Sequence, residues 1–216
     1  MTEAQWHVAV LIPARDEEKL LPKCLRSVLD AAAGLPSSVS FDVVVVVDSS
    51  TDATQEIAER LLDRHGVVVT TNVAVVGSSR SLAAQTALTR YSGPLSKCWL
   101  ANTDADCSVP RTWLIDQIAV AAQNVEAVAG TVDVDSFEEY GPGMIERFRK
   151  TYVIHPDDSH PNIHGAKVLL QLFPQHADAS FRAISAPAKP RGARPARLPL
   201  VITDIFPMDR LREPTF

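Results

Sequence analysis

Short apolar runs alternate with amphipathic stretches from residue 7 to about residue 135. The first run, HVAVLIP, is uninterrupted in apolar character, as expected of a strand covered on both faces, and the second contains five consecutive valines. The predicted strands are HVAVLIP (7–13), FDVVVVV (41–47), GVVVTT (66–71), CWLANT (98–103) and VEAVAGTVDV (125–134). Strands that alternate with helices in this way indicate an α/β fold with a mainly parallel sheet.

The stretches between the strands carry the apolar spacing of helices. One stripe covers residues 20–29 and ends at the glycine of AAAGLP. Asp52, with Gln55 three residues later, resembles a capping box that opens a second helix. SSRSLAAQTALTRY (78–91) predicts a third helix, and a fourth is expected after the fourth strand, with Pro110 in its first turn.

The pattern changes beyond residue 135. The last 61 residues hold nine of the fifteen prolines, and AISAPAKPRGARPARLP (183–199) shows neither apolar period. We therefore predict two regions: a patterned α/β domain over residues 1–166 and an irregular, low-complexity tail over residues 167–216.

Composition narrows the class of protein. The formal net charge of -5 argues against nucleic acid as a partner. No run approaches the ~20 apolar residues that span a bilayer, and no basic region followed by an apolar stretch opens the chain, so we expect a cytoplasmic protein. Cys24, Cys98 and Cys107 form no CxxC pair, which indicates reduced thiols, and Cys107 is expected to be a small buried side chain.

Three polar clusters follow predicted strands. PARDEE (13–18) follows the first strand, DSSTD (48–52) the second, and DAD (104–106) the fourth. In an open α/β sheet, ligands bind beyond the carboxyl ends of the strands, where the connecting loops meet. The three clusters therefore predict one ligand site at that edge.

The residues of these clusters, and the order of the clusters along the chain, resemble those of family 2 glycosyltransferases with the GT-A fold. VLIPARDEEKLLPKCLRSVL resembles the family's opening strand, proline and acidic pair, and WLANTDADCSVP its DxD segment. VVVVVDSSTDATQEIA resembles Asp-Asp-Gly-Ser-Thr-Asp, with Val47 in place of the first aspartate and Ser49 in place of the glycine. NVAVVGSSRSLAAQTAL keeps Asn72, Gly77 and Arg80 of a further segment, and the likeness covers roughly residues 7 to 135.

The resemblance implies a nucleoside diphosphate-sugar donor, with a UDP-sugar favoured, and a divalent cation, Mn²⁺ or Mg²⁺. It assigns Asp106 to the metal and Asp104 to the ribose or to a metal-bound water. It assigns Asp48 to the base ring and Arg80 to the uracil or the phosphates. The backbone that flanks the base is implied to be that of Pro13, Ala14, Arg15 and Asp16.

Residue chemistry agrees with these assignments but also offers simpler ones. Hard divalent cations prefer oxygen ligands, and a turn lets the two aspartates of Asp-x-Asp face different partners. The competing interpretation of that pair is an Asx-turn cap for the helix at Pro110. Asp48 has a competing helix-capping role, which we assign to Asp52 instead, and Glu17 and Glu18 fit negative residues in a first helical turn.

The second half of the chain departs from the family pattern. NIHGA (162–166) resembles a glycine segment that precedes the catalytic base, yet no acidic pair follows it. That base would deprotonate the acceptor hydroxyl in an inverting transfer. We interpret the change near Lys167 as a shifted reading frame or a truncated acceptor region, and the acceptor stays unidentified.

Several alternatives remain open. A degenerate nucleotide-sugar-binding remnant explains the missing base, whereas a sugar-phosphate nucleotidyltransferase would need a glycine-rich loop that PARDEE lacks. The four histidines between His155 and His176 suggest zinc, although prolines interrupt their spacing. Tail cations suggest peripheral contact with anionic lipid, with a solvated tail as the alternative; they are Lys189, Arg191, Arg194 and Arg197.

Overall fold

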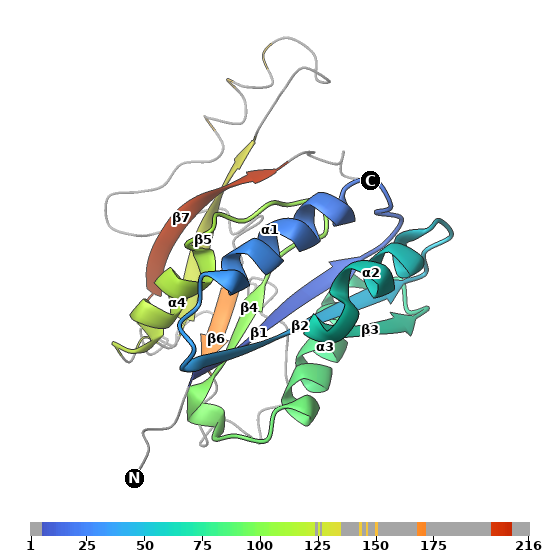
Figure 1. Ribbon diagram of the computed structural model, residues 1–216. Coiled ribbons are helices and arrows are strands. Elements are labelled where there is room, and N and C mark those ends of the chain that lie inside the picture. Colours follow the sequence, from blue (N-terminus) through green and yellow to red (C-terminus); the bar gives the residue numbers. More distant parts are fainter. Residues whose placement is uncertain are drawn as a thin grey trace, which may run out of the picture.

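A mixed sheet of seven strands forms the centre of the computed structural model (Figure 1). The structure describes residues 6–123, 125, 127–134, 143, 146, 150, 168–171 and 200–208 of the chain. The strands are β1 (Trp6–Ala14), β2 (Val39–Asp48), β3 (Gly66–Thr71), β4 (Cys98–Asn102), β5 (Ala127–Val134), β6 (Val168–Gln171) and β7 (Leu200–Met208). Their order is β3-β2-β1-β4-β6-β5-β7. The first four are parallel, β6 is antiparallel to β4 and β5, and β7 is parallel to β5.

Four α-helices lie between the first five strands, which confirms the predicted α/β alternation. They are α1 (Leu21–Ala33), α2 (Thr54–Leu62), α3 (Val76–Arg90) and α4 (Trp113–Ala121), with short 3-10 helices at Asp63–His65 and Leu95–Lys97. None of the helices in the described ranges is long and apolar enough to cross a membrane.

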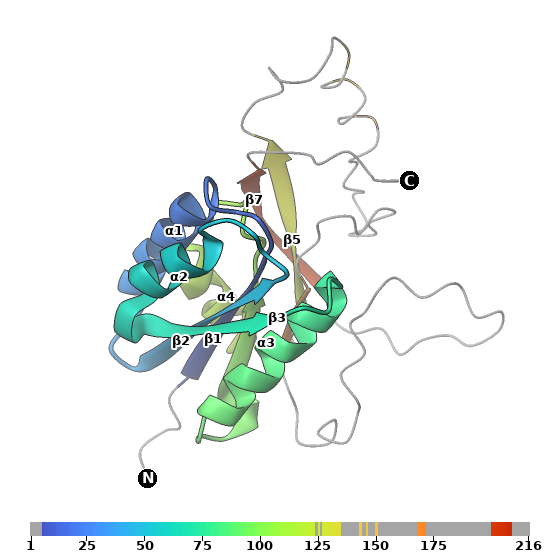
Figure 2. The ribbon, with the colours of Figure 1, turned by 90° about the vertical axis from the view of Figure 1, so that its right-hand side faces the viewer.

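The alternation of side chains along β1 divides the interior into two cores. Val8, Val10 and Ile12 pack with α1, α2 and α4 on one face, while Ala9 and Leu11 pack with α3 on the other. Figure 2 shows α3 on the opposite side of the sheet from α1 and α2. Both faces of the central strands are therefore covered, which explains their unbroken apolar sequences.

The face of α3 against the sheet is made of small side chains. Ala83, Ala84 and Ala87 are all buried and belong to the same core as Val44 and Val46 of β2. Small residues let a helix axis approach a sheet closely, so this helix sits low on the strands.

Two predicted helix starts are wrong. Pro110 lies before α4, where its carbonyl accepts a hydrogen bond from Trp113 N–H at 3.0 Å. The capping box at Asp52 does not form, because α2 begins at Thr54 and the Gln55 side chain donates to Glu59. Asp52 instead accepts the Thr54 N–H at 3.0 Å.

The prediction that the tail lacks regular elements is also wrong in part. Strands β6 and β7 both lie within residues 167–216 and pair with the rest of the sheet. The abundance of proline across the tail hides a shorter apolar run, LVITDIFPM, which forms β7. Backbone pairing with β5 compensates for weak local signals.

Other expectations for the second half lie outside the described residues. These are the glycine segment at 162–166, the histidines between His155 and His176, the Pro/Ala/Arg-rich stretch 183–199 and its four cations.

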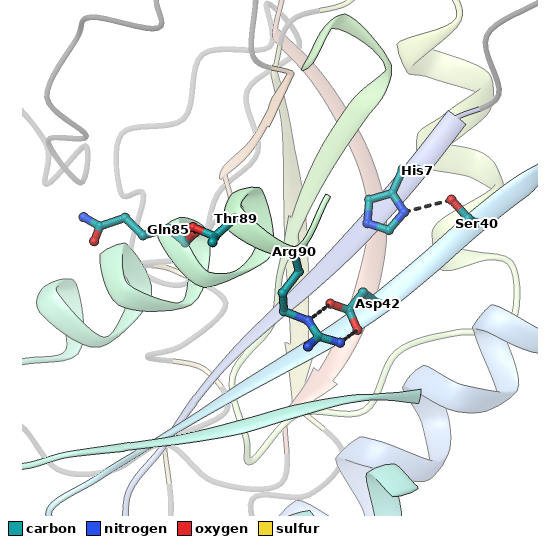
Figure 3. Close-up of polar contacts among 6 residues, drawn as sticks. All are labelled: His7, Ser40, Asp42, Gln85, Thr89 and Arg90. Atoms are coloured by element: carbon teal, nitrogen blue, oxygen red, sulfur yellow. Dashed lines mark hydrogen bonds and ion pairs between the residues drawn. The ribbon is translucent and has the colours of Figure 1, made fainter. Parts of the chain in front are cut away.

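At the amino ends of the central strands, polar contacts attach α3 to β2 (Figure 3). The Arg90 guanidinium donates to both carboxylate oxygens of Asp42, at 2.6 and 3.1 Å. Beside this pair, His7 Nδ1 lies 2.8 Å from Ser40 Oγ, and the His7 ring stacks on Tyr91 with centroids 4.5 Å apart. Burial lowers the pKa of His7 below its ordinary value, and Asp42 partly offsets that effect. These contacts fix the end of α3 to β2.

We expect Arg90→Ala to lower the free energy of unfolding by about 1 kcal/mol, because Asp42 is then left without its bidentate partner. The matched control is Arg60→Ala, in the last turn of α2, where the ion pair with Glu56 is exposed and 3.8 Å long. Its effect should stay within about 0.5 kcal/mol. Urea unfolding at neutral pH measures the free energy of unfolding of both variants. Equal decreases would show that the ion pair of Arg90 with Asp42 stabilises the protein no more than an exposed ion pair does.

Candidate functional site

A cavity of about 440 Å³ opens at the carboxyl ends of β1, β2 and β4. Seven of the eight predicted site residues line it: Pro13, Ala14, Arg15, Asp48, Arg80, Asp104 and Asp106. These residues come from four separate segments of the sequence, and the parallel sheet brings the segments to one edge. The predicted clusters after the first, second and fourth strands therefore do meet.

The Asp-x-Asp pair lies in a turn, as its sequence predicts. Thr103 N–H donates to Leu11 O at 3.1 Å, which holds the end of β4 to β1, and Cys107 N–H donates to Asp104 O at 3.1 Å. The Cys24 thiol donates to the same Asp104 carbonyl at 3.3 Å. The main chain of the pair is thus fixed by both β1 and α1.

The side chains of this turn form a compact donor set. One ligand atom from each of Asp104, Asp106 and Cys107 lies within 4.8 Å of the other two. Two carboxylates at this spacing fit the oxygen preference of Mg²⁺ or Mn²⁺. Cys107 is buried, as expected, and its thiol lies 3.5 Å from Asp106 Oδ1. None of the three cysteines forms a disulfide, and all three are buried.

Arg80 forms an ion pair with Asp104 in the cavity. Its Nη2 lies 2.6 Å from Asp104 Oδ1, and the two side chains are 38% and 30% exposed. Arg80 lies early on α3, as predicted, although Gly77 belongs to the helix and not to the preceding loop. The structure therefore brings Arg80 to the aspartate pair across the cavity.

Asp48 is the most heavily hydrogen-bonded acid of the cavity among the contacts described. Its side chain accepts hydrogen bonds from the N–H groups of Ala74 and Val75 and from Ser79 Oγ, at 2.9, 3.1 and 2.8 Å. Ser49 Oγ donates a fourth, at 3.0 Å. Ala74 has a left-handed φ of 52°, which turns the chain toward the carboxylate. Asp48 thus binds the two residues that precede α3 and the Ser79 side chain in its first turn.

These hydrogen bonds determine the charge state of Asp48. Burial of a residue only 5% exposed would by itself raise the pKa of the carboxyl group. The hydrogen bonds from Ala74, Ser79, Ser49 and Val75 outweigh burial and hold the pKa below its ordinary value. The group is therefore a carboxylate at neutral pH.

Asp16 is the predicted site residue that does not line the cavity. It has a φ of 52°, and its carboxylate accepts hydrogen bonds from Thr51 N–H and Oγ1 at 2.8 and 3.2 Å. Its own N–H donates to Ser50 Oγ. Asp16 thus ties the loop after β1 to the loop after β2.

The first-turn interpretation of Glu17 and Glu18 is wrong, because α1 begins only at Leu21. Glu18 instead contacts the start of α2, where its carboxylate accepts the Ala53 N–H at 3.3 Å. Glu17 is buried and lines the cavity, so sequence reasoning underestimated it. Pro22 was the sequence signal for the start of α1, because proline favours the first turn of a helix. It indicates that the helix begins after Glu17.

Among the cavity residues that the sequence did not reveal, Ser79 and Ala74 contact a predicted site residue. Both act through contacts with Asp48, which lies more than 25 residues earlier. No local motif marks such a pairing.

The fold and this cavity define the GT-A-like class of α/β proteins. The sequence matches the family model for glycosyl transferase family 2 over residues 9–178. Because the match covers most of the chain, the protein belongs to this family. The match extends beyond the residue 135 at which the sequence resemblance was expected to end.

Solved structures of similar fold include S. aureus TarS 1-349 in complex with UDP, at 22% identity and a TM-score of 0.55. The complex of TarS 1-349 with UDP-GlcNAc gives 20% identity and a TM-score of 0.52. Each alignment covers 76% of this chain but only 46% and 45% of TarS 1-349, so this chain spans about half of that length. At these identities the likeness concerns the fold. No curated protein matches the sequence.

We expect Asp48→Asn to lower the free energy of unfolding at pH 7 by about 2 kcal/mol, because a charged acceptor is replaced by a neutral amide. A lowered folded-state pKa means that the carboxylate stabilises the protein above its ordinary pKa of about 3.9, and that this stabilisation is lost as pH falls through the lowered pKa. The difference in the free energy of unfolding between wild type and Asp48→Asn should therefore become smaller at acidic pH. Urea unfolding at several pH values measures it.

Asp63→Asn is the matched control for this experiment, because Asp63 is exposed and its φ of 45° suits asparagine equally well. It should leave the pH dependence unchanged. A difference between wild type and Asp48→Asn that stays constant from neutral to acidic pH would contradict the assigned role of Asp48.

Proposed function

We propose that this chain binds a nucleoside diphosphate-sugar in the cavity at the carboxyl ends of β1, β2 and β4. On this proposal it transfers the sugar to an acceptor with inversion. The convergence of seven predicted donor-site residues on one cavity is the observation that carries the proposal. Membership of glycosyl transferase family 2 supports the reaction class.

A divalent cation, Mn²⁺ or Mg²⁺, is part of the proposal. Asp104 and Asp106 would hold it, since their oxygens lie within 4.8 Å of each other in a turn fixed by backbone hydrogen bonds. Such a cation stabilises the negative charge that develops on the leaving diphosphate. The two carboxylates repel each other without it, so binding also offsets an electrostatic cost of the folded state.

The remaining cavity residues suit the nucleotide. The Pro13–Ala14–Arg15 segment and Asp48 line the cavity and would flank the base. Arg80, which also lines it, carries a guanidinium that matches the geometry of phosphate oxygens. UDP is the first ligand to test, because TarS 1-349 has been crystallised with UDP and UDP-GlcNAc.

A second candidate is a chain that binds the donor but does not transfer the sugar. The sequence favours it at one point, since no acidic pair follows NIHGA (162–166) to supply the expected base. Both candidates share the same donor site, so binding and turnover must be measured separately.

We expect UDP with Mn²⁺ to stabilise the protein against heat, because a ligand that binds only the native state adds about 2.7 kcal/mol at 100 times its Kd. For a domain of this size, that corresponds to a rise in Tm of roughly 5–10 °C. Asp106→Asn should abolish the Mn²⁺-dependent part of the rise. Asp63→Asn, an exposed acid outside the cavity, should retain it.

A thermal-shift panel of UDP, GDP and ADP with and without Mn²⁺ measures this prediction. If no nucleotide raises Tm, or if Asp106→Asn responds like wild type, the proposed donor site is wrong. Hydrolysis of a labelled UDP-sugar in the presence of Mn²⁺ then separates the two candidates. Turnover that Asp106→Asn abolishes indicates an enzyme, and tight binding without turnover indicates the non-transferring chain.

A further inference from the structure

The carboxylate needed by the proposed cation is already bound by an arginine. Arg80 Nη2 lies 2.6 Å from Asp104 Oδ1, inside the donor set that Asp104 forms with Asp106 and Cys107. Asp104 is held at its main chain by Cys107 N–H and the Cys24 thiol. Arg80 is the more adjustable partner, because a long side chain 38% exposed can move without disturbing the core.

A guanidinium and a divalent cation at the same carboxylate repel each other. Asp104 therefore binds each cation more weakly when the other is present, and a further negative charge beside both would relieve their repulsion. A diphosphate supplies that charge, and it is also a bidentate partner for arginine. The two ligands thus have opposite effects on the Arg80–Asp104 contact: the cation competes with Arg80, and the diphosphate attracts it.

The anchoring of α3 keeps this exchange local. Ser79, the residue before Arg80, donates its hydroxyl to the Asp48 carboxylate at 2.8 Å, and both flank the cavity. The backbone of Arg80 is thereby held close to where a nucleotide would lie. Only the side chain has to change partner.

From these contacts we infer that Arg80 couples the binding of cation and nucleotide. In the protein without ligands, Arg80 neutralises Asp104 and weakens the binding of a cation on its own. When a nucleoside diphosphate binds, Arg80 leaves Asp104 for the phosphates and the carboxylate becomes available. Each ligand then strengthens the binding of the other by the same factor. This inference rests on the proposed function and assigns Arg80 a positioning role that simple phosphate binding does not include.

The test is the binding of Mn²⁺ alone and of UDP at saturating Mn²⁺, each by calorimetry, for wild type and Arg80→Gln. The variant should bind Mn²⁺ alone roughly fivefold more tightly, because the competitor is gone. It should bind UDP about tenfold more weakly, because a charged hydrogen-bond donor is lost. The factor by which UDP strengthens Mn²⁺ binding should be smaller in the variant than in wild type.

Arg15→Gln is the matched control, because this substitution removes the same charge from the lining of the same cavity. No described ion pair joins Arg15 to Asp104. Its affinity for Mn²⁺ alone should change by less than about twofold. Arg80→Lys, which keeps the charge, should bind Mn²⁺ less tightly than Arg80→Gln.

Outcomes of opposite sign overturn the inference. If Arg80→Gln binds Mn²⁺ alone more weakly than wild type, or no better than Arg15→Gln does, Arg80 does not compete with the cation. In that case wild type still binds Mn²⁺ and UDP, and the proposed function stands. If wild type binds neither ligand, the proposed function and the coupling fail together.

Discussion

The geometry of the cavity depends on one buried carboxylate, that of Asp48 at the end of β2. A buried charge without partners is costly, and the backbone N–H groups of Ala74 and Val75 supply the compensation. Those N–H groups belong to the two residues that directly precede α3 (Val76–Arg90), so the hydrogen bonds hold the chain where it enters that helix. One interaction therefore satisfies the strand end and the helix end together. It also places Ser79 and Arg80 at the cavity beside the carboxyl ends of the strands.

The other end of α3 is held to the same strand. Arg90 binds Asp42, six residues before Asp48 on β2, so the helix is attached to β2 at both its ends. Between these points, α3 crosses the sheet face opposite α1, α2 and α4 (Figure 2). A helix attached at both ends has little freedom to rotate, and movement at the cavity is left to side chains such as that of Arg80.

The parts of the fold that follow local rules were predictable from the sequence. Continuous apolar runs predicted the first five strands and apolar residues at helical spacing predicted the helices, and the ends of the predicted strands placed the polar clusters on one edge. The resemblance to family 2 added roles for residues such as Asp106, which local patterns do not assign.

Features that depend on distant partners were not predictable in this way. Asp48 finds its donors 26 to 31 residues later, and the contact between Arg80 and Asp104 joins a helix to a different loop. Strand β7 pairs with β5 across more than 60 residues of chain, so the local sequence, which is rich in proline, does not predict the pairing. Boundary errors at Pro110 and Asp52 have a simpler cause, since several residues near a helix start satisfy the same capping preferences.

The alanine face of α3 has a further consequence for the cavity. Ala83, Ala84 and Ala87 act as a spacer of minimal thickness between helix and sheet, on the side of the helix that faces the strands. A leucine there would lift α3 from the sheet and draw Arg80 away from Asp104, although no residue of the cavity had changed. The width of the cavity therefore depends partly on the methyl groups of a hydrophobic core, and inspection of the cavity lining alone would miss this dependence.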